Sequence, residues 1–309
     1  MSSERFSVTG PVSIFQICTI EHFKECERIQ QEIWGGDPIE VVPSHLLVTA
    51  QRHGGLVLGA FDTSGHMVGF LFGFPGRVFG GSPERHENAQ WQHCSHVLGV
   101  VPAWRRQGVG FQLKVTQRAW MMEQGIAHAA WTYDPLEAVN AELNIGRLGA
   151  VCGTYVRDIY GNMADTLNSG LPSDRFEVDW LVADERVNER ILHGWKPSDL
   201  NQLLNTGAVV VNPGSIAGEG IIEPTPVLSV REKTMLIEIP TSIQTIKKAS
   251  LGRAIAWRLN VREAAESLFE AGYEVRDVTQ TEDASCARMY YVLQKRTKEP
   301  QIVAEGNRR

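Results

Sequence analysis

Residues 97–114 of this 309-residue chain read VLGVVPAWRRQGVGFQLK. The first five residues are apolar and predict a β-strand, and an amphipathic helix is predicted to begin near Val109. Around the start of this helix, Gly108 and Gly110 carry no Cβ atom, so the backbone can come close to a ligand. The first N–H groups of a helix have no partner inside it, and the helix dipole adds about half a positive charge there. The segment therefore predicts a cradle for a diphosphate or a similar anion.

Two common nucleotide-binding motifs do not fit these residues. A Walker loop has Lys and then Ser or Thr after its last glycine, and a dinucleotide-binding turn has a third glycine and an acidic residue about twenty positions further on. Neither pattern is present around Gly108 and Gly110. Arg105 and Arg106 add two positive charges beside the glycines, which favours an anionic ligand of another kind.

The spacing Arg105-x-x-Gly108-x-Gly110, with the strand before it, resembles the acyl-CoA-binding signature of the GNAT superfamily of N-acyltransferases. The resemblance implies that acyl-CoA, either acetyl-CoA or succinyl-CoA, is a co-substrate. It implies that the diphosphate is bound by Arg105, Arg106, Gln107, Gly108, Val109 and Gly110. It also implies that pantetheine and the thioester carbonyl are bound by the backbone of Leu98, Gly99 and Val100, with the Val100 N–H as the oxyanion donor.

The order of the predicted elements over residues 12–165 is also the one that the GNAT fold uses. The predicted fold class is α/β (α+β), the GNAT fold, with a mixed, mostly antiparallel central sheet flanked by helices and a C-terminal α/β extension. The predicted elements are strand 12–19, helices 20–34 and 44–53, strands 56–61, 67–74 and 96–101, helix 109–124, strand 126–133 and helix 136–148. Ser44 is expected to cap its helix, and the expected buried residues of helix 109–124 are Val109, Leu113, Val115 and Met122.

The second part of the chain repeats this pattern loosely, without a Gly-x-Gly cradle. A GNAT acyl-CoA-binding catalytic domain is predicted over residues 1–184 and a C-terminal α/β extension over 185–309. The extension is either a degenerate GNAT-like half packed on the first or a separate domain. Its predicted elements are a partly helical segment 185–204, strands 207–212 and 234–239, helix 250–271, and strands 274–278 and 289–294.

Composition and charge exclude several classes of protein. With 43% hydrophobic and 21% charged residues the chain is typical of a globular protein, and a net charge of −6 without basic clusters argues against a nucleic-acid partner. No apolar run approaches the roughly twenty residues of a membrane helix, and no secretory signal is evident, so a cytoplasmic location without membrane attachment is expected. The five scattered cysteines predict no disulfide framework. No metal site is expected at His93-Cys94-Ser95-His96, because adjacent strand side chains point to opposite faces.

Acyl transfer to an amine requires removal of a proton from the ammonium form of the acceptor. His96 lies two residues before Leu98, at a position that a histidine occupies in some amine-acetylating relatives, and it is the predicted catalytic base. An unperturbed imidazole pKa near 6.5 leaves it largely neutral at pH 7. The alternative is a structural histidine packed beside Trp91 or Trp131.

Many GNAT members use a tyrosine on the helix after the fifth strand to protonate the leaving thiolate. The corresponding helix 136–148 has no tyrosine, and Ile145 falls near the usual position. The sequence leaves open a substitute from Tyr133, Tyr155 or Tyr160, or water. Asn140 and Asn144 are four residues apart and so share a helix face. The resemblance implies that at least one of them contacts the pantetheine arm, and capping or loop bridging is the alternative.

Further segments resemble a narrower group, the predicted acetyltransferases found in bacteria with N-acylamino acid racemases. They are Trp131 to Asn144, Leu148-Gly149-Ala150, Tyr160-Gly161, Leu167 to Arg175, Trp180 and Gly272-Tyr273. This resemblance implies succinyl-CoA-dependent N-succinylation of amino acids, notably D-amino acids. An arginine would then bind a substrate carboxylate. Arg175 is the first candidate, followed by Arg157, Arg258 and Arg262, of which the last two also fit exposed salt bridges on a long helix.

The sequence therefore predicts an N-acyltransferase that moves an acetyl or succinyl group from CoA to a small amine, in particular an amino acid, by direct attack in a ternary complex. Two alternatives stay open: a non-catalytic CoA-sensing or assembly protein, and a peptide N-acetyltransferase. The expected partner is a small-molecule amine or amino acid, and a homodimer is compatible with the sequence.

Overall fold

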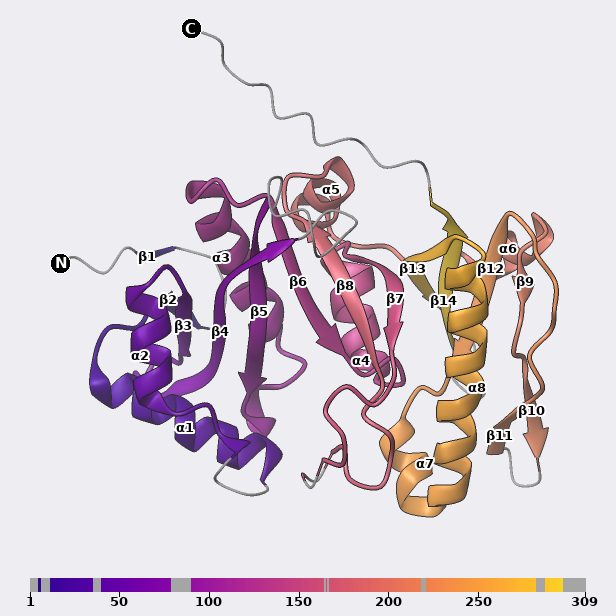
Figure 1. The fold of residues 1–309 in the computed structure, drawn as a ribbon, viewed down its shortest axis with the longest axis horizontal. Helices are drawn as coiled ribbons and strands as arrows, with labels where there is room; N and C mark the ends of the chain where they lie inside the picture. Colours follow the sequence, from indigo (N-terminus) through magenta and orange to yellow (C-terminus); the bar gives the residue numbers. More distant parts are fainter. Residues whose placement is uncertain are drawn as a thin grey trace, which may run out of the picture.

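One twelve-stranded sheet runs through the whole molecule (Figure 1). The computed structural model describes residues 5–6, 12–35, 40–78, 90–163, 165, 167–217, 221–281 and 287–296. The strands of the sheet are β1 (Arg5–Phe6), β2 (Ser13–Gln16), β3 (Leu56–Phe61), β4 (Met67–Val78), β5 (Gln90–Val100), β6 (His128–Tyr133), β7 (Val151–Val156), β8 (Arg175–Leu181), β9 (Val209–Val210), β12 (Thr234–Ile239), β13 (Tyr273–Gln280) and β14 (Met289–Lys295). Their spatial order is β1-β2-β3-β4-β5-β6-β8-β7-β13-β14-β12-β9. A separate hairpin consists of β10 (Gly214–Ala217) and β11 (Ile221–Pro224).

Helices flank this sheet. In the N-terminal part, α1 (Ile20–Trp34) and α2 (Ser44–Arg52) lie in front of the strands in the view of Figure 1, and α3 (Val109–Glu123) lies behind them. The remaining elements are the 3₁₀ turn η3 (Pro102–Trp104), α4 (Ala138–Ala141), the π-helix η4 (Glu142–Arg147), α5 (Glu185–His193), α6 (Leu200–Asn205), α7 (Ile243–Ala249) and α8 (Leu251–Glu270). The only parallel neighbours among the described strands are β5–β6 and β9–β12. The predicted fold class, a mixed and mostly antiparallel sheet flanked by helices, is confirmed.

The two parts of the chain share one strand arrangement. The segment β6–α4/η4–β7–β8 places its strands in the order β6-β8-β7, and the segment β12–α7–α8–β13–β14 places its strands in the order β12-β14-β13. Each segment has a parallel strand beside its first strand. β7 and β13 meet antiparallel at the pair Cys152↔Val275, which joins the two arrangements into one sheet. The division at residue 184 stays a prediction.

Apolar side chains form two large clusters. One consists of β2–β4 packed against α1, α2 and α3. The larger one contains residues on both sides of position 184, among them Phe176, Trp180, Trp257 and Tyr291, all at most 1% exposed. The second part of the chain is therefore packed into the same core as β6–β8.

Several predicted boundaries change. The strand expected over 96–101 is the longer β5, which begins at Gln90. The helix expected over 136–148 is a short α-helix that continues as a π-helix. Ser44 does not cap α2: the N-cap is Pro43, and Ser44 is the first helical residue, with its N–H bonded to Glu27. In α3, Val109 and Leu113 are buried as predicted. Val115 is half-buried and Met122 is 50% exposed, and Met121 is buried in place of Met122.

Candidate active site

The predicted strand, turn and helix are present around the glycine cradle. β5 ends at Val100, and α3 begins at Val109 after a turn in which Arg106 and Gly108 have φ angles of 61° and 83°. The Gln112 N–H donates to the Gly108 carbonyl, so the N–H groups of Val109, Gly110 and Phe111 precede the first full helical bond. Arg105, Arg106 and Gln107 are exposed around this helix start. The arrangement suits an anion bound from the solvent side.

The structure accounts differently for the three glycines of this region, Gly99, Gly108 and Gly110. A left-handed φ explains Gly108. A Cβ at Gly99 would lie 2.8 Å from Ile33 Cδ1, so the packing of α1 on β5 favours a glycine there. At Gly110 a Cβ would meet nothing closer than Leu98 Cδ2 at 3.5 Å, which is ordinary contact. The described fold therefore does not require a glycine at position 110.

β5 and β6 separate soon after they meet. They pair only at His93↔Ala129 and Cys94↔Ala130, after which β6 pairs with β8 alone. The β4–β5 register shifts between Val97 and Ser95, which makes His96 the extra residue of a bulge. The Val101 N–H donates to the Val68 carbonyl at 3.0 Å. Because backbone groups alternate along a strand, the N–H groups of Leu98 and Val100 point away from β4, toward the gap.

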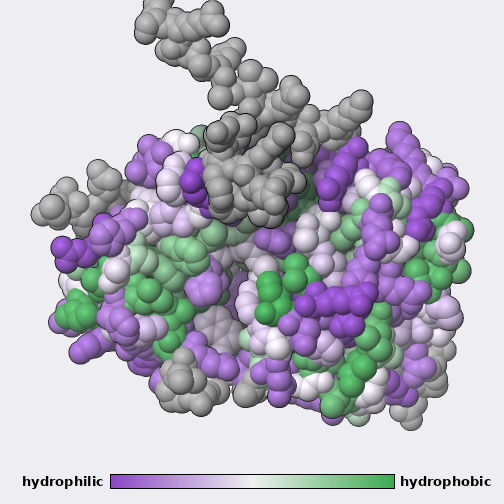
Figure 2. Space-filling view, viewed as in Figure 1, coloured by the Kyte–Doolittle hydropathy of each residue, from purple (hydrophilic) through white to green (hydrophobic). Residues whose placement is uncertain are grey.

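A pocket of about 160 Å³ lies where the two strands diverge. On the face shown in Figure 2, the surface is hollowed between the part that carries α1 and α2 and the part that carries α8. Among its described lining residues, Glu177 carries the one carboxylate, and none is Arg or Lys. The lining residues are Gln92, Cys94, Ser95, His96, Ala130, Trp131, Thr132, Tyr160 and Glu177.

His96 lies in this pocket wall. Its ring packs near Phe72 and Phe74, with centroids 5.9 and 5.7 Å apart, and not beside Trp91 or Trp131 as the structural alternative expected. The side chain is exposed, while the loss of hydrating water around it lowers the pKa of the imidazole below its ordinary value. His96 is therefore neutral at pH 7 and able to accept a proton. Its catalytic role stays a prediction.

Of the three tyrosines left open by the sequence, Tyr160 reaches the pocket. Its hydroxyl lies 2.8 Å from Thr132 Oγ1, and the side chain is exposed. Tyr133 is buried and donates to the Tyr291 hydroxyl at 3.1 Å. Tyr155 donates to Asp174 Oδ2 at 2.6 Å. Of these three tyrosines, Tyr160 is thus the one that lines the pocket, and its role as a proton donor stays a prediction.

Asn140 and Asn144 are not held on one regular helix face, because the π-helix begins between them. Asn144 is buried, and its Oδ1 accepts a hydrogen bond from Trp131 Nε1 at 3.2 Å. That bond positions one wall of the pocket. Asn140 is half-buried in α4. Contact of either residue with pantetheine stays a prediction.

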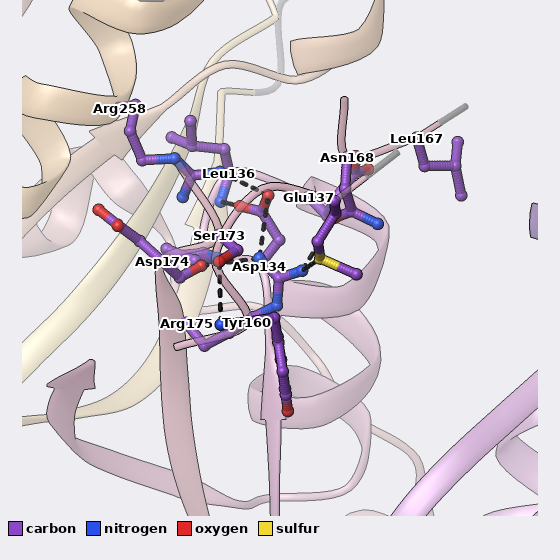
Figure 3. Close-up of polar contacts among 12 residues, drawn as sticks. Asp134, Leu136, Glu137, Tyr160, Leu167, Asn168, Ser173, Asp174, Arg175 and Arg258 are labelled. Atoms are coloured by element: carbon purple, nitrogen blue, oxygen red, sulfur yellow. Dashed lines mark hydrogen bonds and ion pairs between the residues drawn. The ribbon is translucent and has the colours of Figure 1, made fainter. Parts of the chain in front are cut away.

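Arg175 does not line the pocket. It is 6% exposed, and its guanidinium donates to the Asp174 carbonyl and to Asn168 Oδ1, each at 2.9 Å (Figure 3). It also lies 3.9 Å from Asp134 Oδ2 and 5.5 Å from the centroid of the Tyr160 ring. Arg175 therefore supports Tyr160 from inside the protein, and its predicted contact with a substrate carboxylate gains no support from this placement.

Arg258 and Arg262 do not form exposed salt bridges along α8, as the sequence alternative expected. Arg258 is fully buried and donates to Asp134 Oδ2 after β6 (Figure 3). Arg262 donates two hydrogen bonds, of 2.7 and 2.9 Å, to the buried carboxylate of Asp174. Both arginines therefore tie α8 to the N-terminal part of the chain.

Sequence reasoning missed a polar cluster behind the pocket. Lys114 of α3 is 3% exposed, and its Nζ lies 2.7 Å from the Ser95 hydroxyl. Gln117 bonds to the same hydroxyl at 3.1 Å. The sequence contained one signal for this cluster: the polar residues Lys114 and Gln117, which lie three positions apart in helix 109–124 after Leu113. The prediction did not use it, because only apolar residues were expected on the buried face of that helix.

The chain matches no protein-family model and no curated protein. Solved structures match part of it. A Desulfovibrio desulfuricans protein described as an acetyltransferase of the GNAT family is 14% identical and covers 56% of this chain and 99% of its own, with a TM-score of 0.42. The ribosomal-protein-S18-alanine N-acetyltransferase of Escherichia coli is 16% identical and covers 56% of this chain and 97% of its own, with a TM-score of 0.42. An aminoglycoside acetyltransferase from an uncultured soil metagenomic sample is 17% identical and covers 42% of this chain and 82% of its own, with a TM-score of 0.35.

The described residues contain no candidate for a membrane-spanning helix or for a metal site. None of their helices is both long and apolar enough to cross a membrane. Their His, Cys, Asp and Glu side chains form no group of three or more that could hold a metal ion.

Proposed function

We propose that this chain is an acyl-CoA-dependent N-acyltransferase of the GNAT type. The observation that carries the proposal is the meeting of two features at Gly110. The start of α3 offers N–H groups to a diphosphate, and a Cβ at Gly110 would lie 3.5 Å from Leu98, whose strand edge faces the gap. An acyl-CoA molecule has a diphosphate followed by an extended amide chain, which matches a helix start followed by an open strand edge.

In the proposed reaction the amine nitrogen forms a bond to the thioester carbonyl carbon, and the carbon–sulfur bond breaks. The N–H of Val100 stabilises the negative charge that develops on the carbonyl oxygen. The base predicted from the sequence is His96, which would accept a proton from the acceptor directly or through water. Tyr160 donates a proton to the departing sulfur. Arg105, Arg106, Gln107, Val109 and Gly110 bind the diphosphate.

The proposed acceptor is a small-molecule amine. A pocket that contains Glu177 and the neutral imidazole of His96 attracts an ammonium group. N-Succinylation of an amino acid is the narrower hypothesis, and it requires a cation that binds carboxylates. The described lining has no arginine, so the pocket favours an amine without a carboxylate near the reacting nitrogen.

The first experiment measures CoA binding and acyl transfer together. Calorimetry gives the affinity for CoA, and release of free CoA thiol is followed from acetyl-CoA and succinyl-CoA with panels of amines, D- and L-amino acids and peptides. We expect turnover with amines. Turnover confined to succinyl-CoA and amino acids would select the narrower hypothesis, and turnover confined to peptides would select a peptide N-acetyltransferase. CoA binding without any turnover would indicate a CoA-sensing protein.

Gly110→Ala tests the cradle itself. The added Cβ makes only ordinary contacts within the protein, so we expect unchanged stability and a loss of CoA affinity of at least about tenfold. Gly252→Ala is a matched control, because Gly252 is the second residue of α8 as Gly110 is of α3, and its Cβ would also have room. Unchanged CoA affinity in Gly110→Ala would contradict the proposed cradle.

A further inference from the structure

Lys114 is a buried amine with an unusual set of neighbours. Its Nζ lies 2.7 Å from Ser95 Oγ on β5 and 3.4 Å from the centroid of the Trp131 ring on β6. The Trp180 ring on β8 is 5.9 Å away. Among the described residues, no carboxylate forms an ion pair with it. The other titratable group beside it is His93, which is buried and has a pKa lowered to about 4, chiefly by that burial.

These neighbours favour the neutral form of Lys114 in the resting protein. Burial lowers the pKa of the Lys114 amine well below its usual value. Lys114 Nζ donates to Ser95 Oγ at 2.7 Å, and the Ser95 hydroxyl donates to Gln117 Oε1 at 3.3 Å. Because a neutral amine has a lone pair, the hydroxyl hydrogen can turn from Gln117 to the nearer Lys114 Nζ. The Trp131 face can stabilise the ammonium form when a proton arrives, because a cation over an indole ring is attracted to it. Lys114 therefore combines a proton-accepting resting state with a stabilised protonated state.

Ser95 connects this amine to the pocket. Ser95 and Trp131 line the pocket, while Lys114 lies behind them on α3. A group in the pocket can thus approach Ser95 Oγ from one side while Lys114 Nζ holds its other side. Glu177 and His96, the ionisable residues that line the pocket besides Cys94 and Tyr160, reach it from other positions on β8 and β5.

We propose that Ser95 and Lys114, in place of His96, form a proton relay that deprotonates the acceptor ammonium, an inference that rests on the proposed function. The acceptor gives a proton to Ser95 Oγ while the Ser95 hydroxyl proton moves to Lys114 Nζ. The acceptor becomes a neutral nucleophile, and Lys114 becomes an ammonium over the Trp131 ring. After the product leaves, Lys114 returns the proton through Ser95 to water. Ser95 is the group that touches the substrate, and Lys114 acts through it.

Lys114→Met tests the relay, because methionine keeps an unbranched apolar side chain and removes the amine. We expect kcat/KM for an alkylamine acceptor to fall by about 100-fold, as for loss of a general base, with CoA affinity unchanged. Ser95→Ala should produce a similar fall. With an acceptor that is already neutral at pH 7, such as hydroxylamine, kcat/KM of both variants should fall far less. Lys24→Met on the exposed side of α1 is the control.

The pH profile separates a relay from a structural role. In the unmodified protein, kcat/KM for hydroxylamine should depend weakly on pH, while kcat/KM for the alkylamine should rise as Lys114 loses its proton. Above that pH the profile of the unmodified protein should level off, whereas in Lys114→Met it should keep rising with the fraction of the free alkylamine that is neutral. Equal loss with both acceptors, or no loss with either, would overturn the relay while acyl transfer by the unmodified protein still supported the proposed function. Absence of turnover in the unmodified protein would instead overturn both.

Discussion

Asp174 is a single residue on which much of the contact between α8 and the N-terminal part depends. Its carboxylate is completely buried and accepts hydrogen bonds from Arg262, Tyr155 and the Asp158 N–H. Burial raises the pKa of this carboxyl, but these donors outweigh burial and lower the pKa below its ordinary value. A carboxyl with a lowered pKa in the folded state contributes stability above its unfolded pKa of about 3.9. The contribution is lost as the pH falls through the folded value.

We expect Asp174→Asn to lower the free energy of unfolding by about 3 kcal/mol at pH 7, because it leaves a largely buried guanidinium without its charge partner. Below about pH 4 the difference from the unmodified protein should shrink. Asp174 of the unmodified protein becomes protonated there, first in the unfolded state and at lower pH in the folded state, so its charge no longer stabilises the fold. Urea unfolding at pH 7 and at pH 3 measures both. Glu266→Gln is the control: it breaks the exposed two-bond pair with Arg157 and should cost much less. Equal losses in the two variants would refute this role of Asp174.

At the scale of elements, the turn before α3 depends on a glycine in the left-handed region. Gly108→Ala should lower the free energy of unfolding by about 1 kcal/mol and shift the N–H groups that form the cradle. Gly65→Ala in the β3–β4 hairpin is the matched control, because Gly65 has the same φ of 83° and a Cβ there would also have room. Both variants should lose similar stability in thermal unfolding, and only Gly108→Ala should lose affinity for CoA. Similar CoA affinities in the two variants would contradict the proposal that this turn positions the N–H groups that bind CoA.

The same elements show what the sequence could predict. α3 begins at the predicted residue, because a glycine turn followed by a periodic helix is a local signal. The π-helix of Glu142–Arg147 has no such signal. A Cβ at Gly146 would lie 3.0 Å from the Trp195 ring, so this turn is packed against a residue about fifty positions away. The Ser95–Lys114 contact likewise joins a strand to a helix nineteen positions further along the chain. Such features depend on tertiary contacts, which no local pattern contains.

At the scale of the whole molecule, the prediction was weakest where the second part of the chain meets the first. The charge pattern of α8 favoured an exposed helix, since Arg258 and Arg262 alternate with acidic residues. The structure buries Arg258 completely and pairs it with Asp134, more than a hundred positions earlier. A sequence pattern gives the polarity of each residue but not the partner that neutralises it. The same limit applies to Arg175, whose charge could have served a substrate as well as Asp134 and Asn168.

The shared sheet and core predict that the chain unfolds as one unit. β7 and β13 are neighbours in the sheet, and Trp257 of α8 packs in the same apolar cluster as Phe176 and Trp180 of β8. Trp257→Ala should lower the free energy of unfolding by about 4 kcal/mol through the cavity it leaves. Differential scanning calorimetry should show a single transition in both proteins, with the whole transition at lower temperature in the variant. Two transitions, of which Trp257→Ala moves only one, would show instead that residues 1–184 fold independently of the rest.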